Sequence, residues 1–295
     1  MSTVSVSPAF VHPGPPPELP ELPEGVTLGP RWAPWMAPLA LLGGLAGALV
    51  GGLTIGLISA AAGASLSHPP PGVGIAETVV QDLAFVGAAV LFAGMAGRPA
   101  RRSDFGLRSA RLWGAVGWLV LAWLAFLTFS ALWGAIVSDH SKQRLLHELG
   151  ADRSTAGLVA AAALVTVVAP VCEELFFRGF FYRALSNWRG PWLAAIITGL
   201  VFGGVHAGPD TPAALLLPLA FFGFALCLLY RRTGSLYPCI ALHVLNNCLA
   251  FGVTEHWGWQ IPVLMVAALA TVGLGAVLIH PRRRPQGSAS APVPA

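Results

Sequence analysis

Long apolar segments dominate the pattern of hydrophobic and polar positions along this chain. Each is about 18 residues or longer, enough for a helix to cross the hydrocarbon core of a bilayer. The pattern predicts an all-α fold, a polytopic transmembrane helix bundle with about eight spans. The predicted spans cover residues 35–61, 75–97, 112–137, 156–184, 191–208, 212–230, 236–253 and 260–280.

Composition agrees with a membrane environment. Hydrophobic residues make up 55% of the 295 positions and charged residues only 10%, whereas soluble domains carry about 25% charged residues. The mean hydropathy is +0.70. With so few polar side chains the chain cannot cover a water-soluble globule, and we expect a lipid bilayer around it. The net charge of +4 comes from basic residues in short loops, so no nucleic-acid partner is expected.

The ends of the chain differ from the middle. Residues 1–34 are rich in Pro, and we expect a disordered tail there without assigning it a role. Residues 282–295 have a similarly biased composition and are expected to form a second disordered tail. The transmembrane domain is predicted to occupy residues 35–281 between them.

The distribution of basic residues predicts the orientation of the spans. With a cytoplasmic N-terminus, 13 of the 17 Lys and Arg residues fall in segments on the cytoplasmic side and only three outside. Basic residues concentrate on the cytoplasmic side of membrane proteins. The sequence therefore predicts a multi-pass protein of the inner cell membrane with both termini in the cytoplasm. The three outside residues are Lys142, Arg144 and Arg153.

Charged residues inside the fourth predicted span need a reason, because each costs roughly 2.5–3.5 kcal/mol at the centre of a bilayer. Glu174 and Arg178 are four residues apart, so they share a helix face and can neutralise each other. Glu173 is rotated by about 100° from Glu174 on a helix and has no basic partner on its own helix. The pairing therefore accounts for Glu174 and leaves Glu173 unexplained.

Two later spans also contain polar residues at helical spacing. Phe202 and His206 are four apart, with two Gly residues between them that permit close approach of another helix. His243 and Asn247 are again four apart. If these residues meet Glu173 in a cavity, the group can activate a water molecule and stabilise an oxyanion, as peptide hydrolysis requires. Counting residues from the predicted span ends places His206 roughly 7 Å deeper than Glu173, so their meeting is a prediction.

These motifs resemble those of the CAAX-protease and bacteriocin-processing family of intramembrane proteases, which includes the type II CAAX prenyl endopeptidases and the abortive-infection proteins. The family pattern is Glu-Glu-x-x-x-Arg, Phe-x-x-x-His and His-x-x-x-Asn or Asp. All three parts are present in this order, and the resemblance covers about residues 156–250, the predicted catalytic core. The matching residues are Glu173, Glu174, Arg178, Phe202, His206, His243 and Asn247.

The resemblance implies a role for each of these residues. Glu173 matches the base that activates the hydrolytic water, and His206 matches a residue that holds this water or stabilises the developing charge. His243 and Asn247 match positions that complete the water site and the oxyanion pocket. Glu174 and Arg178 match a supporting pair, in agreement with their shared helix face.

The need for a metal stays open at this point. Members of the resembling family were first classed as metalloproteases, and a metal-free glutamate mechanism is now favoured for them. Glu173, His206 and His243 are also a set of ligands that Zn²⁺ accepts, with a position left for water. The expected partner is a peptide or protein substrate at the membrane, whose identity the sequence does not give. The oligomeric state is not predicted either.

Two other functional classes were weighed. Intramembrane acidic and His residues also line ion pathways, and Glu77, Gln81 and Asp82 in the second span would suit a proton- or ion-coupled transporter. A catalytically silent immunity or scaffold protein of the same fold is the other alternative. The stretch from His147 to Ala151 begins like the zinc-protease motif His-Glu-x-x-His but ends in Ala. We assign it no chemistry and expect a short interfacial helix there, ended by Gly150.

Overall fold

The computed structural model describes residues 32–65, 70–97, 99–137, 145–208 and 211–279, all within one compact unit, Arg31–Ala295. The predicted tails lie outside the described residues, except for residues 32–34. Trp32, which the sequence analysis placed in the N-terminal tail, is buried, and its ring packs on Phe180 with a centroid distance of 4.9 Å.

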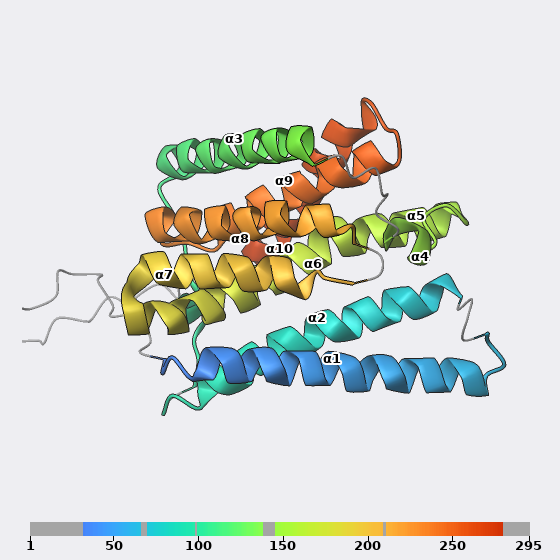
Figure 1. Cartoon of the computed structure of the whole chain (residues 1–295), viewed down its shortest axis with the longest axis horizontal. Helices are drawn as coiled ribbons and strands as arrows, with labels where there is room; N and C mark the ends of the chain where they lie inside the picture. Colours follow the sequence, from blue (N-terminus) through green and yellow to red (C-terminus); the bar gives the residue numbers. More distant parts are fainter. Residues whose placement is uncertain (1–31, 66–69, 98, 138–144, 209–210, 280–295) are drawn as a thin grey trace, which may run out of the picture. The chain divides into compact units, whose positions relative to one another are not determined.

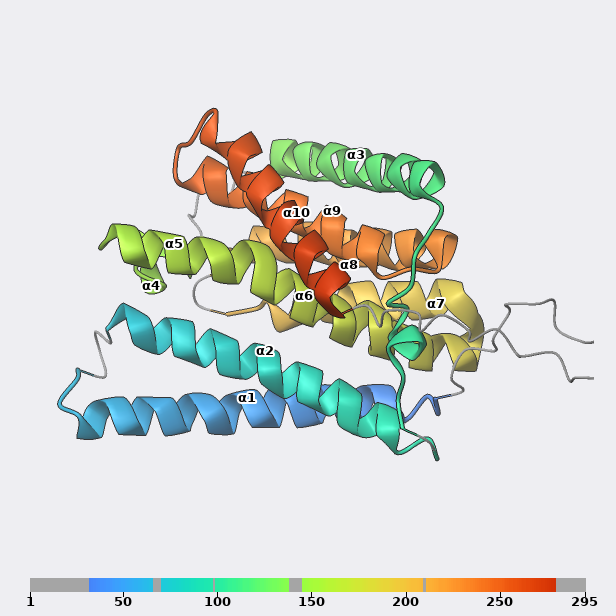
Figure 2. The same cartoon turned by 180° about the vertical axis from the view of Figure 1, so that it is seen from behind.

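The described residues are helical and contain no strand, which confirms the predicted all-α fold (Figures 1 and 2). The long helices are α1 (Met36–Ala61), α2 (Pro71–Gly94), α3 (Leu112–Ile136), α7 (Tyr182–Val205), α8 (Ala213–Thr233), α9 (Tyr237–Thr254) and α10 (Gln260–Ile279). The shorter elements are η1 (Arg102–Phe105), α4 (Leu145–Glu148), α5 (Thr155–Ala163), η2 (Leu164–Val168), α6 (Ala169–Glu174) and η3 (Leu175–Phe181).

Six helical segments of the described residues are long and apolar enough to cross a membrane. One of them, Thr155–Val205, is 51 residues long and runs from α5 to α7, so it covers the fourth and fifth predicted spans together. Helix α9 is not among the six, since His243, Asn246 and Asn247 lower its hydropathy. Each of the eight predicted segments nevertheless corresponds to helix, which agrees with about eight spans.

A sharp break inside α7 separates the fourth predicted span from the fifth. Gly190 has φ +80° and ψ 174°, a backbone conformation that is open to Gly and strained for other residues. Pro191 follows, and its fixed φ suits the first turn of a new helix. The sequence Arg189-Gly190-Pro191 therefore ends one helix and begins the next without a separate loop.

The helices pack as pairs around the segment from α5 to η3. Helix α1 lies along α2, α3 lies against α8, α7 lies beside α8, and α9 contacts α10 (Figures 1 and 2). Helix α2 also contacts α6 and η3. Large apolar side chains of α1, α3 and α10 face outward, as expected for lipid-facing helices; they include Leu49, Leu57, Trp113, Ile136 and Val277.

Small residues bring α7 and α8 into close contact. A Cβ atom added at Gly203 would lie 2.5 Å from the Leu216 carbonyl oxygen, closer than real contacts allow. The same test at Gly204 finds nothing within 4 Å. Of the two glycines between Phe202 and His206, only Gly203 therefore permits the close helix approach that the sequence suggested.

The predicted short helix before the fourth span is present as α4, and Gly150 follows it with φ +75°. His147 Nδ1 lies 2.7 Å from the Asp152 carboxylate, and both side chains are exposed. The hydrogen bond from His147 holds the pKa of Asp152 below its usual range. This local pair lies outside the apolar helices and supports leaving His147 out of the chemistry.

Candidate active site

Two π-helical segments flank the helix that carries the adjacent glutamates. α6 ends at Glu174, with η2 before it and η3 directly after it. In a π-helix each backbone N–H bonds the carbonyl five residues earlier, so the turn is wider than in an α-helix, and such turns are frequent at functional sites. Glu173 and Glu174 therefore lie between two local departures from α-helical geometry.

Glu174 and Arg178 form the ion pair that their spacing predicted. Arg178 Nη1 donates to Glu174 Oε1 at 2.7 Å, and neither side chain is exposed. Arg178 Nη2 donates to the Gly223 carbonyl at 3.0 Å, and the guanidinium lies 4.6 Å from the centre of the Phe202 ring. The pair thus ties η3 to α8 and to the second half of α7.

His243 lies between the two glutamates. Its Nδ1 is 2.8 Å from Glu174 Oε1 and its Nε2 is 3.9 Å from Glu173 Oε2. Because a carboxylate only accepts hydrogen bonds, Nδ1–H donates to Glu174. The imidazole is 3% exposed, and the rings of Phe202 and Phe222 stand edge-on to it at centroid distances of 5.8 and 5.4 Å. This packing fixes the orientation of Nε2 toward Glu173.

A small cavity brings Glu173 and His206 together. It has about 90 Å³ of space for water-sized molecules, and both side chains line it, together with Gln81 and Asp82 of α2. A water molecule needs roughly 10–15 Å³ of such space and two to four polar partners. Glu173 Oε2 is buried and has no hydrogen-bond partner among the described residues. The cavity can therefore hold water against an available carboxylate oxygen.

His206 is held in one ring orientation. It caps the C-terminal end of α7, and its Nδ1 is 2.7 Å from the Phe202 carbonyl oxygen. A carbonyl accepts and does not donate, so Nδ1 carries the proton and the Nε2 of a neutral ring keeps a free lone pair. With their four-residue spacing, His206 therefore contacts Phe202 twice, through the backbone carbonyl and through the ring. The two ring centroids are 4.8 Å apart.

Asn247 does not line this cavity. Its Nδ2 donates to the Val165 carbonyl at 2.9 Å, and Val165 belongs to the π-helical segment η2. The π-helical donor to this carbonyl would be the N–H five residues on, but that residue is Pro170, which has no N–H. The Asn247 amide supplies the donor instead. The residue therefore joins α9 to the helix that leads into Glu173.

The structure thus brings five of the six predicted site residues, Glu173 included, into one cluster. The sixth, Asn247, contacts the helix before Glu173 instead. The depth difference expected for His206 is not observed, since it reaches the same cavity as Glu173. Sequence reasoning assigned Asp82 only to the transporter alternative. Asp82 is 4% exposed, lines the cavity, and its Oδ2 has no partner among the described residues. Acidic residues in an apolar span, here Glu77 and Asp82, were the signal that pointed to it.

The zinc site that the sequence left open can be compared with the positions of Glu173, His206 and His243. Within the described ranges, no three His, Cys, Asp or Glu side chains are arranged as ligands for a metal ion. The Nδ1 atoms of His206 and His243 contact Phe202 and Glu174, an arrangement that a metal-ligating histidine also uses. The described positions of Glu173, His206 and His243 are not gathered as a zinc site, and no step proposed below uses a metal.

Comparisons with curated proteins find three relatives over part of the chain. "Uncharacterized protein YyaK" of Bacillus subtilis (strain 168) is 30% identical over 122 residues, 39% of this chain and 40% of that protein. "Putative membrane peptidase YdiL" of the same organism is 33% identical over 82 residues, 28% of this chain and 32% of that protein. "UPF0177 protein YaiF" of Lactococcus lactis subsp. lactis (strain IL1403) is 25% identical over 121 residues.

The matched part spans between 32% and 53% of the length of these curated relatives. No solved structure matches the chain. A family model described as "Type II CAAX prenyl endopeptidase Rce1-like" matches residues 155–249, the segment that carries Glu173, His206 and His243. Over residues 155–249, this multi-pass membrane protein is therefore similar to the type II CAAX prenyl endopeptidase Rce1-like family.

Proposed function

We propose that this protein is an intramembrane endopeptidase in which Glu173 activates the hydrolytic water. One observation carries the proposal: Glu173 and His206, from separate helices, line one cavity of about 90 Å³ inside an apolar bundle. The match of residues 155–249 to a prenyl endopeptidase family supports the reaction class. Charged groups buried in a membrane cost free energy, and where they occur they usually have a function, such as hydrolysis here.

In the proposed first step, Glu173 removes a proton from a water molecule whose oxygen attacks the carbonyl carbon of the substrate peptide bond. The new C–O bond turns the carbonyl oxygen into an oxyanion. The lone pair on His206 Nε2 accepts the second water proton in a hydrogen bond and so orients the attacking oxygen. In the second step the carboxylic acid of Glu173 returns its proton to the amide nitrogen, and the C–N bond breaks.

His243 is proposed to stabilise the oxyanion. With Nδ1–H given to Glu174, a second proton on Nε2 makes the ring an imidazolium that donates toward the reacting atoms. Glu174, Arg178 and Asn247 act as positioning residues, because their contacts hold His243 and the helix before Glu173.

The proposed setting follows from the loop charges. We place the protein in the inner cell membrane with both termini in the cytoplasm, and its partner is a peptide or protein substrate that reaches the cavity at the membrane. Nothing on the walls of the cavity selects a prenylated substrate over another peptide, so the substrate class remains a membrane-associated peptide.

The test is Glu173→Gln, which keeps the size of the side chain and removes the base. Glu77→Gln is the matched control, because Glu77 lies in α2 without lining the cavity. Wild type and both variants are expressed to equal levels in membranes, and new peptide termini across the membrane proteome are compared. Losing a general base costs about 10²–10⁴-fold in rate, so termini that depend on the protein should vanish with Glu173→Gln and persist with Glu77→Gln.

Two outcomes would contradict the proposal. Termini that persist unchanged in Glu173→Gln would remove Glu173 as the base. If no termini depend on the protein while Glu173→Gln abolishes proton movement into proteoliposomes, the transporter alternative is correct. Asp82 beside Glu173 is the observation that favours that alternative. Metal dependence is tested separately by adding a chelator to the purified protein, and we expect peptide cleavage to continue in its presence.

A further inference from the structure

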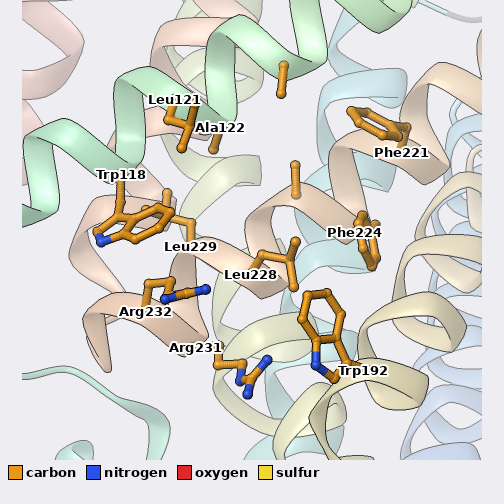
Figure 3. A pocket seen from close by; sticks show the side chains of 12 residues that line it. Trp118, Leu121, Ala122, Trp192, Phe221, Phe224, Leu228, Leu229, Arg231 and Arg232 are labelled. Carbon is orange, nitrogen blue, oxygen red and sulfur yellow. The ribbon is translucent and has the colours of Figure 1, made fainter.

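A second cavity lies on the outer side of the bundle, away from the glutamates. It is formed by α3, α8 and the second half of α7, and it has about 170 Å³ of space (Figure 3). Its walls are largely apolar and include four aromatic side chains. Trp118 comes from α3, Trp192 from α7, and Phe221 and Phe224 from α8. Several of these side chains are half exposed, so the cavity is a groove that opens to the surroundings of the bundle.

Two arginines close one side of this groove. Arg231 and Arg232 lie in the last turn of α8, and Figure 3 shows them on the side opposite Phe221. The guanidinium of Arg231 lies 5.1 Å from the ring centre of Trp192, and that of Arg232 lies 4.6 Å from Trp118. Within the part of the chain that the structure describes, neither arginine has a carboxylate in ion-pair distance. Two fixed positive charges thus face the groove without an acidic partner.

The length of the groove matches one leaflet of a bilayer. Phe221, Phe224, Leu228 and Arg231 share one face of α8, and ten residues of α-helix span about 15 Å. This is half of the roughly 30 Å hydrocarbon core. Arg and Trp residues are characteristic of the membrane–water interface, so the arginine side of the groove belongs at the headgroup level and Phe221 near the middle of the bilayer.

We propose that this groove binds one anionic phospholipid, with its phosphate on Arg231 and Arg232 and an acyl chain along the α8 face. Charge complementarity selects the phosphate headgroup, because the two guanidinium groups have no acidic partner among the described residues and Arg binds phosphate in a bidentate manner. The apolar wall selects the acyl chain, which a free phosphate ion lacks. The site is separate from the cavity at Glu173, so it stands whether or not the protein is a protease.

The test measures lipid retention by native mass spectrometry of the full chain, released from nanodiscs that contain equal amounts of phosphatidylglycerol and phosphatidylethanolamine. Wild type should retain one phosphatidylglycerol molecule in preference. Arg231→Gln/Arg232→Gln should lower this retention by roughly tenfold or more, since each basic residue strengthens binding to an anionic lipid about fivefold. Arg111→Gln/Arg189→Gln is the matched control, because it removes two exposed charges outside the groove, one of them also above a Trp ring.

A second pair of variants tests the tail without changing the charge. Ala125 lines the groove, whereas Ala131 is exposed on the same helix outside it. Ala125→Phe should fill the groove and reduce lipid retention, and Ala131→Phe should leave it unchanged. Equal losses in the two arginine pairs, or in the two Ala→Phe variants, would overturn the proposal. So would displacement of the lipid by millimolar inorganic phosphate, which would show that the apolar wall does not contribute.

Discussion

Replacing Arg178 by Met should destabilise the protein strongly, because it leaves the Glu174 carboxylate without its charge partner in the centre of the bundle. Both side chains are fully buried, and their atoms are 2.7 Å apart. Removing one member of a buried ion pair typically costs about 3–5 kcal/mol. Arg178 also donates to the Gly223 carbonyl and lies over the Phe202 ring, so we expect a loss toward the upper end of that range.

The double variant Glu174→Gln/Arg178→Met separates the charge from the packing. A Gln side chain still accepts the hydrogen bond from His243 Nδ1, and no buried charge is left alone. The remaining cost is the lost hydrogen bond from the charged Arg178 to the Gly223 carbonyl, about 1.5–3 kcal/mol. The double variant should therefore be more stable than Arg178→Met by about 1–3 kcal/mol, and the coupling energy follows once the effect of Glu174→Gln alone is also subtracted.

The free energy of unfolding of the four proteins can be measured by titration with sodium dodecyl sulfate in mixed micelles, followed by tryptophan fluorescence. Glu174→Gln alone completes the cycle. The reasoning is refuted if Arg178→Met unfolds within about 1 kcal/mol of wild type, or if the double variant is no more stable than Arg178→Met. Either result would mean that water or a conformational change already solvates the Glu174 carboxylate.

Two further predictions use neighbouring residues as controls. Gly203→Ala should cost about 1–3 kcal/mol of stability in the same titration, because its methyl group meets the α8 backbone, whereas Gly204→Ala should be neutral or slightly stabilising; equal effects would contradict the close packing of α7 on α8. Asn247→Ala should cost about 1–3 kcal/mol by leaving the Val165 carbonyl without a donor. Asn246→Ala should change stability by less than about 0.5 kcal/mol, and a larger loss for Asn246 than for Asn247 would be incompatible with this bond.

Hydropathy and helical spacing predicted much of the fold. The eight apolar segments all correspond to helix, and the break before Pro191 was visible as a polar interruption. The i,i+4 spacing of Glu174 and Arg178 gave their contact correctly, because both partners lie on one helix and local geometry decides the distance. Spacing could not show that only Gly203, of the two adjacent glycines, faces α8, since that depends on the rotation of α7.

Contacts between helices were the part that sequence could not supply. The motif pattern grouped His243 with Glu173, yet the short contact of His243 is with Glu174. Asn247 was assigned to the water site and instead contacts the backbone of η2. Asp82 lies about 90 positions before Glu173 in the sequence, and only the packing of α2 on α6 brings the two carboxylates to one cavity. Each of these outcomes depends on how whole helices are rotated and translated, which no local pattern encodes.

The π-helical segments on either side of Glu173 and Glu174 have a consequence for changes in chain length. A π turn contains one residue more than the α turn it replaces, so deleting one residue from Leu175–Phe181 would restore ordinary α bonding. One turn then replaces one turn, so the helices on either side of the deletion keep their relative rotation. The chain can therefore lose one residue here without turning Glu174 away from the histidine on α9. The change falls on the residues within the turn, Arg178 among them.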